Sequence, residues 1–170
     1  SALFTASATI AIAQRWAPGQ PYLYSAVVKV LSGAAVRDAE RLTFGVRSAR
    51  FTADRGFFLN DRPLKIQGTC NHHDHAGVGA ALPDRLQAFR LSVLQEMGCN
   101  AVRTSHNMPT PEWVEACDRM GVMLMCETRQ MSSNAEGMQE LEMMVKRYRN
   151  SPSIIIWSIG NEEWLDRKST

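Results

Sequence analysis

Four apolar, strand-like segments alternate with helix-like segments over residues 63–160, and this alternation constrains the fold more than any other feature of the sequence. The strand-like segments are PLKIQGTC (63–70), CNAVRTS (99–105), VMLMCE (122–127) and SIIIWSIG (153–160). Continuous apolar strands joined by helical crossovers predict a parallel sheet covered by helices. The repeat of about 25–30 residues suits a doubly wound sheet or a (β/α)8 barrel, which needs about 250 residues. A chain of 170 residues has room for the first half of such a barrel.

The segments between these strands carry helix signals at both ends. We expect helices over residues 84–97, 111–120 and 136–149. Thr110 before Pro111 is a favourable start, because threonine caps a helix and proline fits its first position. Gly121 is a natural stop for the same helix.

Residues 1–50 have a different character and predict the end of a β-sandwich domain. LYSAVVKVL (23–31) alternates, Ser32-Gly33 suggests a turn, and ERLTFGVRSARF reads as a second extended segment. Two to four strands cannot cover both faces of a sandwich. The sequence therefore predicts two truncated domains, a β-sandwich end over 1–50 and a half barrel over 51–170.

Composition excludes several classes of function. The net charge is +2, which gives no basic footprint for nucleic acid or an anionic membrane surface. No apolar run approaches the roughly 20 residues that span a bilayer. The four cysteines form no CxxC pair and are expected to be mostly buried free thiols. We expect no cofactor, since phosphate-binding glycine loops and a GxSxG nucleophile motif are absent.

Unusual polar residues follow each predicted strand at its carboxyl end, where parallel α/β folds place their chemistry. They are His72, His73, Asp74 and His75 after the first strand, Arg103, His106 and Asn107 at the second, Glu127 at the third, and Asn161 and Glu162 after the fourth. The strand starts carry little comparable chemistry. All these groups are therefore expected at one mouth of the sheet.

Alternatives remain open for several of these residues. The HHDH run could bind a metal ion, but it lacks helical ligand spacing, and hydrogen-bonding residues of a pocket are the favoured interpretation. Glu127 could contact substrate or serve as an ion-pair partner of a nearby arginine. Trp157, within an apolar strand, could belong to the core or line a pocket.

The motifs together resemble glycoside hydrolase family 2, the family of β-galactosidases, β-glucuronidases and β-mannosidases. The resemblance rests on FTADRGFFLNDRPLKIQGTCNHHDHAGVGAALPDR, EMGCNAVRTSHNMPTPEWVEACDRMGVMLMCETR and RNSPSIIIWSIGNEE, in that order. It implies an immunoglobulin-like sandwich before a (β/α)8 catalytic barrel. The HHD loop and the CETR segment are most similar to β-galactosidase-type members.

The resemblance also implies a mechanism and a site. Members cleave β-glycosides with retention, so Glu162 would be the acid/base and Asn161 would bind the sugar 2-hydroxyl. His73, Asp74, Arg103, His106, Asn107, Glu127 and Trp157 would line the substrate pocket, and the partner would be a carbohydrate. TRQMSSNAEG lacks the histidine through which some β-galactosidases bind magnesium, so no metal is expected.

Departures limit what this chain could do alone. Ser151 and Cys126 stand where the family usually has histidine and aspartate, and the nucleophile glutamate would lie beyond Thr170. The isolated piece is expected to be inactive, and its unpaired sheet edges predict aggregation or homo-oligomers. Two other readings are a non-catalytic carbohydrate-binding relative and a metal-dependent hydrolase that uses the HHDH loop.

Overall fold

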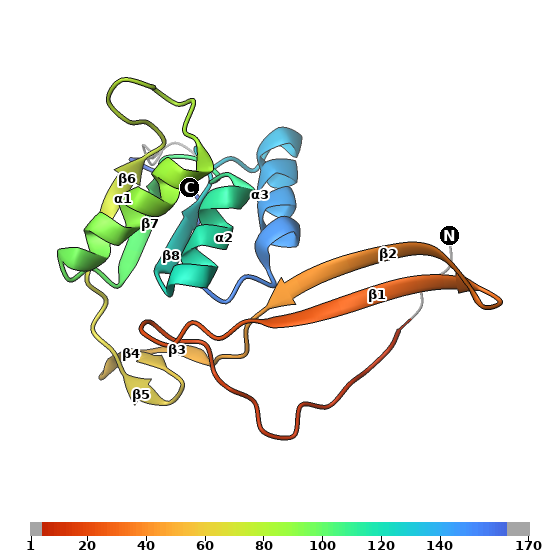
Figure 1. Ribbon diagram of the computed structural model, residues 1–170. Coiled ribbons are helices and arrows are strands. Elements are labelled where there is room, and N and C mark those ends of the chain that lie inside the picture. The colour runs from red at the N-terminus through yellow and green to blue at the C-terminus, as the bar shows by residue number, and fades with distance from the viewer. Residues whose placement is uncertain (1–4, 163–170) are drawn as a thin grey trace.

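The computed structural model describes residues 5–162 and contains three sheets and three helices within that range. The elements are β1 (Tyr24–Ser32), β2 (Ala35–Phe44), β3 (Ala49–Thr52), β4 (Gly56–Leu59), β5 (Arg62–Pro63), β6 (Gly68–His72), α1 (Asp84–Glu96), β7 (Ala101–Ser105), α2 (Pro111–Met120), β8 (Met123–Glu127), α3 (Ala135–Tyr148) and β9 (Ile154–Ser158). Figure 1 shows a helix-covered sheet, with the β1–β2 hairpin projecting away from it.

The parallel sheet is the centre of the structure, and its strands follow in the order β6-β7-β8-β9. All three helices lie against one side of it (Figure 1). Leu91, Val102, Val114, Leu124 and Met144 belong to the core between helices and strands. Apolar strands and amphipathic helices thus bury each other, as the sequence pattern predicted.

The helix boundaries agree with the sequence signals to within a residue or two. The Thr110 hydroxyl accepts a hydrogen bond from the Trp113 amide at 3.4 Å and caps α2. Gly121 ends α2 with a φ of 74°, a left-handed conformation that glycine adopts without steric cost.

The first barrel strand lies further along the chain than predicted. Residues 63–70 were expected to form it, but β6 covers Gly68–His72 and β5 ends at Pro63. The Asn100 side chain explains the difference, because it accepts from the Gln67 amide at 2.9 Å and donates to the Lys65 carbonyl at 2.9 Å. The Lys65 carbonyl and the Gln67 amide therefore bond to a side chain instead of a neighbouring strand.

The second extended segment of residues 1–50 is two strands. β1 and β2 form the predicted antiparallel hairpin, but the chain leaves the ladder at Gly45 and resumes as β3. A Cβ atom on Gly45 would lie 2.6 Å from Pro152 Cβ, so only glycine fits there. Arg47 donates from Nε to the Pro152 carbonyl at 2.9 Å and from Nη2 to the Ile154 carbonyl. The strand breaks where the chain docks against the start of β9.

A second apolar cluster joins the N-terminal segments to the base of the parallel sheet. It comprises Trp16, Phe57, Leu59, Ala101 and Met123. Trp16 is fully buried, and its indole Nε1 donates to the Asp118 carbonyl at 2.8 Å. The predicted domain boundary at residue 50 lies within β3, and the division into domains stays a prediction.

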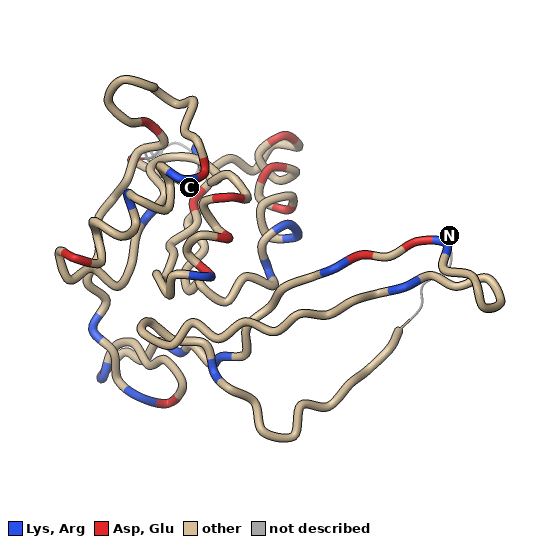
Figure 2. The backbone as a smooth tube through the Cα atoms, in the orientation of Figure 1, with Lys and Arg blue, Asp and Glu red and all other residues tan. Residues whose placement is uncertain are grey.

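Charged residues of both signs are distributed over the structure (Figure 2), as the nearly neutral net charge suggests. Figure 2 shows acidic and basic residues on the hairpin and on all three helices. Across residues 5–162, no helix has the length and apolarity to cross a membrane. Cys117 and Cys126 are buried thiols, Cys99 is half-buried and Cys70 is exposed.

Candidate active site

The carboxyl ends of the four parallel strands bring most of the predicted polar residues together. The register sets His72 beside Ser105 and Glu127 beside Ser158. Parallel strands deliver their following loops to one edge of the sheet, so residues far apart in the chain meet there.

Glu127 lies at the centre of this edge and is fully buried. Its Oε2 accepts from Arg103 Nε at 2.6 Å and from Ser158 Oγ at 2.9 Å, and its Oε1 accepts from His106 Nδ1 at 2.8 Å. Its own amide donates to Thr104 Oγ1 at 3.2 Å. One carboxylate at the end of β8 therefore binds groups from the ends of both neighbouring strands, β7 and β9.

The charge of Glu127 is stabilised in place. Burial by itself raises the pKa of this carboxyl, but the hydrogen bonds from Arg103, His106 and Ser158 outweigh it, and the net pKa is lowered. The same contact with Glu127 raises the pKa of the Arg103 guanidinium. Both groups are charged at neutral pH and form an ion pair.

Arg103 connects this pair to the end of β9. Its Nη2 donates to Asn161 Oδ1 at 2.7 Å. The same Nη2 lies 3.3 Å from His106 Nδ1, but Nδ1 already donates to Glu127, so this contact joins two donors and is not a hydrogen bond. Asn161 is thereby held directly before Glu162.

A cleft of about 500 Å³ opens beside this network. Its lining includes His73, Asp74, His106, Asn107 and Arg129. The rings of His72 and His106 meet edge to face with centroids 5.2 Å apart. Polar groups from the loops after β6, β7 and β8 thus surround a space large enough for a sugar ring.

Two predicted site residues lie at the margin of the arrangement. Glu162 is exposed and has a φ of 53°, a conformation that residues other than glycine seldom adopt and that is often found at functional sites. Trp157, on β9, is 37% exposed, so it is not a core residue in this structure. No hydrogen bond between the Glu162 side chain and another residue of the described range occurs.

Two contacts of the site were not predicted from the sequence. Ser158 donates to Glu127, and Cys70 Sγ lies 3.8 Å from Arg103 Nη1. The sequence signal that could have identified Ser158 is its place as the polar residue at the end of an otherwise apolar strand. Within residues 5–162, no three His, Cys, Asp or Glu side chains are grouped as a metal site. Of the HHDH run, His72, His73 and Asp74 line the cleft.

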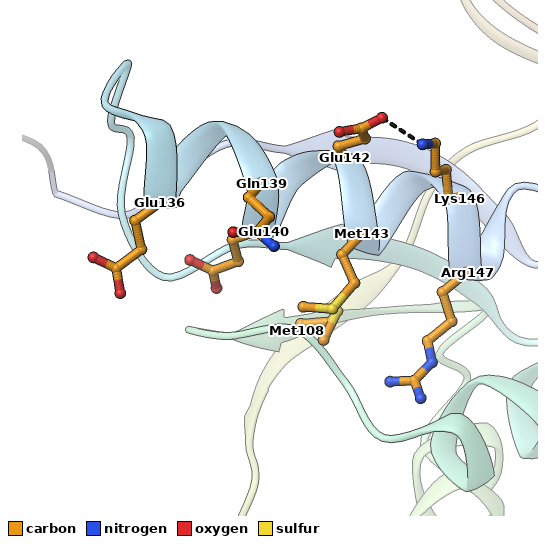
Figure 3. A pocket seen from close by; sticks show the side chains of 8 residues that line it. All are labelled: Met108, Glu136, Gln139, Glu140, Glu142, Met143, Lys146 and Arg147. Carbon is orange, nitrogen blue, oxygen red and sulfur yellow. Dashed lines mark ion pairs between the residues drawn. The ribbon is translucent and has the colours of Figure 1, made fainter.

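A larger hollow of about 850 Å³ lies on the outer side of α3 and is separate from this site. Figure 3 shows Met108 and Met143 side by side at its middle, with Glu136 toward one end of α3 and Arg147 toward the other. It contains none of the residues of the Glu127 network. The chemistry of the strand ends belongs to the smaller cleft.

Comparison with known families matches almost the whole chain. Residues 52–137 and 132–169 match the model described as "Glycosyl hydrolases family 2, TIM barrel domain". Residues 2–47 match the model described as "Glycosyl hydrolases family 2". The four-stranded parallel sheet is therefore part of a TIM barrel, as the strand pattern predicted.

Individual relatives agree with the family models. The chain is 38% identical to "Beta-galactosidase BoGH2A" of Bacteroides ovatus over 98% of its length, and 34% identical to a "Putative beta-glucuronidase" of Formosa agariphila over 89%. Its fold is similar to the crystal structure of a beta-glycosidase from Bacteroides vulgatus, with 36% identity, a TM-score of 0.83 and 92% of the chain covered. The chain spans only 21%, 16% and 22% of these three proteins.

Proposed function

The chain belongs to glycoside hydrolase family 2, and from this premise we propose that it forms the acid/base side of the active site in a retaining β-glycosidase. The observation that carries the proposal is the contact between Arg103 and Asn161, which fixes the residue before Glu162 at the mouth of the sheet. Members of this family are glycosidases, and the proposal assigns their acid/base role to Glu162.

Glu162 would act twice in the reaction. It would first donate its proton to the oxygen of the leaving group, while a second carboxylate attacks the anomeric carbon and forms a glycosyl-enzyme. It would then take a proton from the water that releases the sugar with retention. The two carboxyl groups of such an enzyme lie about 5–5.5 Å apart.

The second carboxylate is assigned to a part of the protein outside this chain. Glu127 is fully buried and already accepts three hydrogen bonds, so it is a poor nucleophile candidate. Asp74 lies near Arg90 in the loop after β6. Within the described sheet, β6 is at the edge opposite to β9, the strand that precedes Glu162. We therefore propose that a later barrel strand supplies the nucleophile and that the isolated chain is inactive.

The substrate is proposed to be a terminal β-glycoside. β-Galactosides are the first choice, because the relative with 38% identity is named a β-galactosidase, and β-glucuronides are the second, because another with 34% identity is named a putative β-glucuronidase. His73, Asp74 and Asn107 line the cleft and are the proposed partners of sugar hydroxyls. Asn161 is the proposed partner of the 2-hydroxyl.

The test uses the full natural protein that contains these residues, assayed on nitrophenyl β-galactoside, β-glucuronide and β-mannoside. Glu162→Gln is compared with Glu163→Gln, the same change one residue later. The proposal expects turnover of one sugar by wild type, a loss of about 10²–10⁴-fold in kcat in Glu162→Gln, and near-normal turnover in Glu163→Gln. A loss confined to Glu163→Gln would move the acid/base role to that residue, and no turnover of any β-glycoside by the folded wild type would refute the proposal.

A further inference from the structure

The hydrogen bonds of Glu127 leave it no free place for a substrate. Its Oε2 accepts hydrogen bonds from Arg103 and Ser158, and its Oε1 accepts one from His106. None of its surface is exposed to solvent. The three donors come from the ends of the two strands beside β8, with Arg103 on β7, His106 directly after β7, and Ser158 on β9. A buried charge that is fully hydrogen-bonded fixes the side chains around it.

Arg103 is oriented by this contact. Its Nε is committed to Glu127, and the planar guanidinium then has a single rotation that brings Nη2 to Asn161 at 2.7 Å. Arginine can only donate hydrogen bonds, so the atom of Asn161 that faces it is the carbonyl oxygen. The amide of Asn161 is therefore not free to flip.

We propose that Glu127 is a positioning residue, which acts through Arg103 to hold the Asn161 amide so that Nδ2 is free to donate to a ligand. Within the described part of the chain, no residue accepts a hydrogen bond from this Nδ2. Nδ2 is a donor, so the ligand atom that it meets must be an acceptor such as a hydroxyl oxygen. This inference rests on the proposed function, in which that ligand atom is the sugar 2-hydroxyl.

The substitution Glu127→Gln separates this role from simple space filling. Glutamine has almost the same shape, but one of its two terminal atoms is an NH₂ group that can only donate. Its NH₂ group can meet His106 only after the proton of that ring moves from Nδ1 to Nε2, and the Arg103 guanidinium loses the negative charge of its ion pair. Ser158→Ala removes one of the three donors and leaves the carboxylate, so it should cause a smaller effect in the same direction.

The readout is the preference for a 2-hydroxyl in the full natural protein. It is measured as the ratio of kcat/KM for a nitrophenyl β-glycoside and its 2-deoxy analogue. Independently of turnover, it is measured by calorimetry as the ratio of Kd for the free sugar and the 2-deoxy sugar. Glu142→Gln, the same change at an exposed ion pair of α3, is the matched control.

We expect Glu127→Gln to lower kcat/KM for the 2-hydroxy substrate by about 10- to 100-fold and to affect the 2-deoxy substrate much less. The preference for the 2-hydroxyl should fall in both ratios, and Glu127→Asp should recover part of it. Equal losses on both substrates would mean a merely structural role and would overturn the inference.

The two proposals fail in different ways. A wild type that binds the sugar without hydrolysing it would overturn the glycosidase proposal alone, because the ratio of Kd values still tests Glu127. A Glu127→Gln variant that keeps the wild-type ratio in an active enzyme would overturn this inference alone.

Discussion

Replacing Trp16 with phenylalanine should loosen the contact between the N-terminal segment and the base of the barrel sheet. The indole of Trp16 is fully buried, and its Nε1 donates to the Asp118 carbonyl at 2.8 Å. Asp118 lies in the last turn of α2, where carbonyl groups have no partner within the helix. Trp16 therefore caps this end of α2 from another part of the chain.

The expected cost combines three effects. The hydrogen bond itself contributes about 1 kcal/mol, a buried carbonyl left without a partner costs about 1–3 kcal/mol, and the smaller ring leaves a gap in the core. Because these effects overlap, we expect a total of about 2–3 kcal/mol. Every 1.4 kcal/mol changes an equilibrium constant tenfold, so local opening should increase by roughly 30- to 150-fold.

Hydrogen exchange measured by mass spectrometry can detect this opening in the full natural protein. The Trp16 amide donates to the Val46 carbonyl and the Val122 amide to the Cys117 carbonyl, so peptides covering residues 14–22 and 117–124 should exchange faster. Tyr24→Phe is the control, since its hydroxyl accepts from an exposed amide, and we expect a change within about 0.5 kcal/mol. Unchanged exchange in both peptides of Trp16→Phe would refute this account of the junction.

Two further predictions concern groups buried in the α/β core. Burial raises the pKa of Asp118 above its ordinary value of 3.8, although the Ser153 amide donates to the carboxylate. The folded state therefore holds this proton more tightly than the unfolded state, and the contribution of Asp118 to stability falls as pH rises from 3.8 through the raised pKa. The free energy of unfolding of Asp118→Asn in urea, relative to that of wild type, should therefore be more favourable at pH 7 than at pH 4. The opposite trend would contradict a raised pKa for Asp118. Burial also raises the pKa of Cys126 to about 12 and that of Cys117 well above its usual value. Iodoacetamide should label neither thiol in the native protein and both after denaturation, and native labelling of either would show that the core is open.

The sequence predicted the parts of the fold that depend on local patterns. The periodicity of the apolar residues predicted four parallel strands, and Thr110 and Gly121 marked the ends of α2. The first barrel strand was predicted too early because the side chain of Asn100, 33 residues away, takes the backbone groups near Gln67. Such a contact has no signal in the local sequence.

The site shows the same division. The polar residues after each strand indicated where the site would lie, because parallel strands end at one edge. Their partners could not be predicted, since the approach of Ser158 to Glu127 depends on the pairing of β8 with β9. Glu127 was expected either to contact substrate or to pair with an arginine, and the structure places it in an ion pair with Arg103.

The central claim, that Glu162 is the acid/base of a retaining glycosidase, is tested most directly by azide rescue of Glu162→Gln in the full natural protein. Without the carboxylate, water attacks the glycosyl-enzyme slowly, whereas azide needs no proton removed and can attack in its place. We predict that azide restores turnover of the nitrophenyl glycoside and that NMR identifies the product as the β-glycosyl azide. Full activity without azide, or an α-glycosyl azide as the product, would contradict the claim.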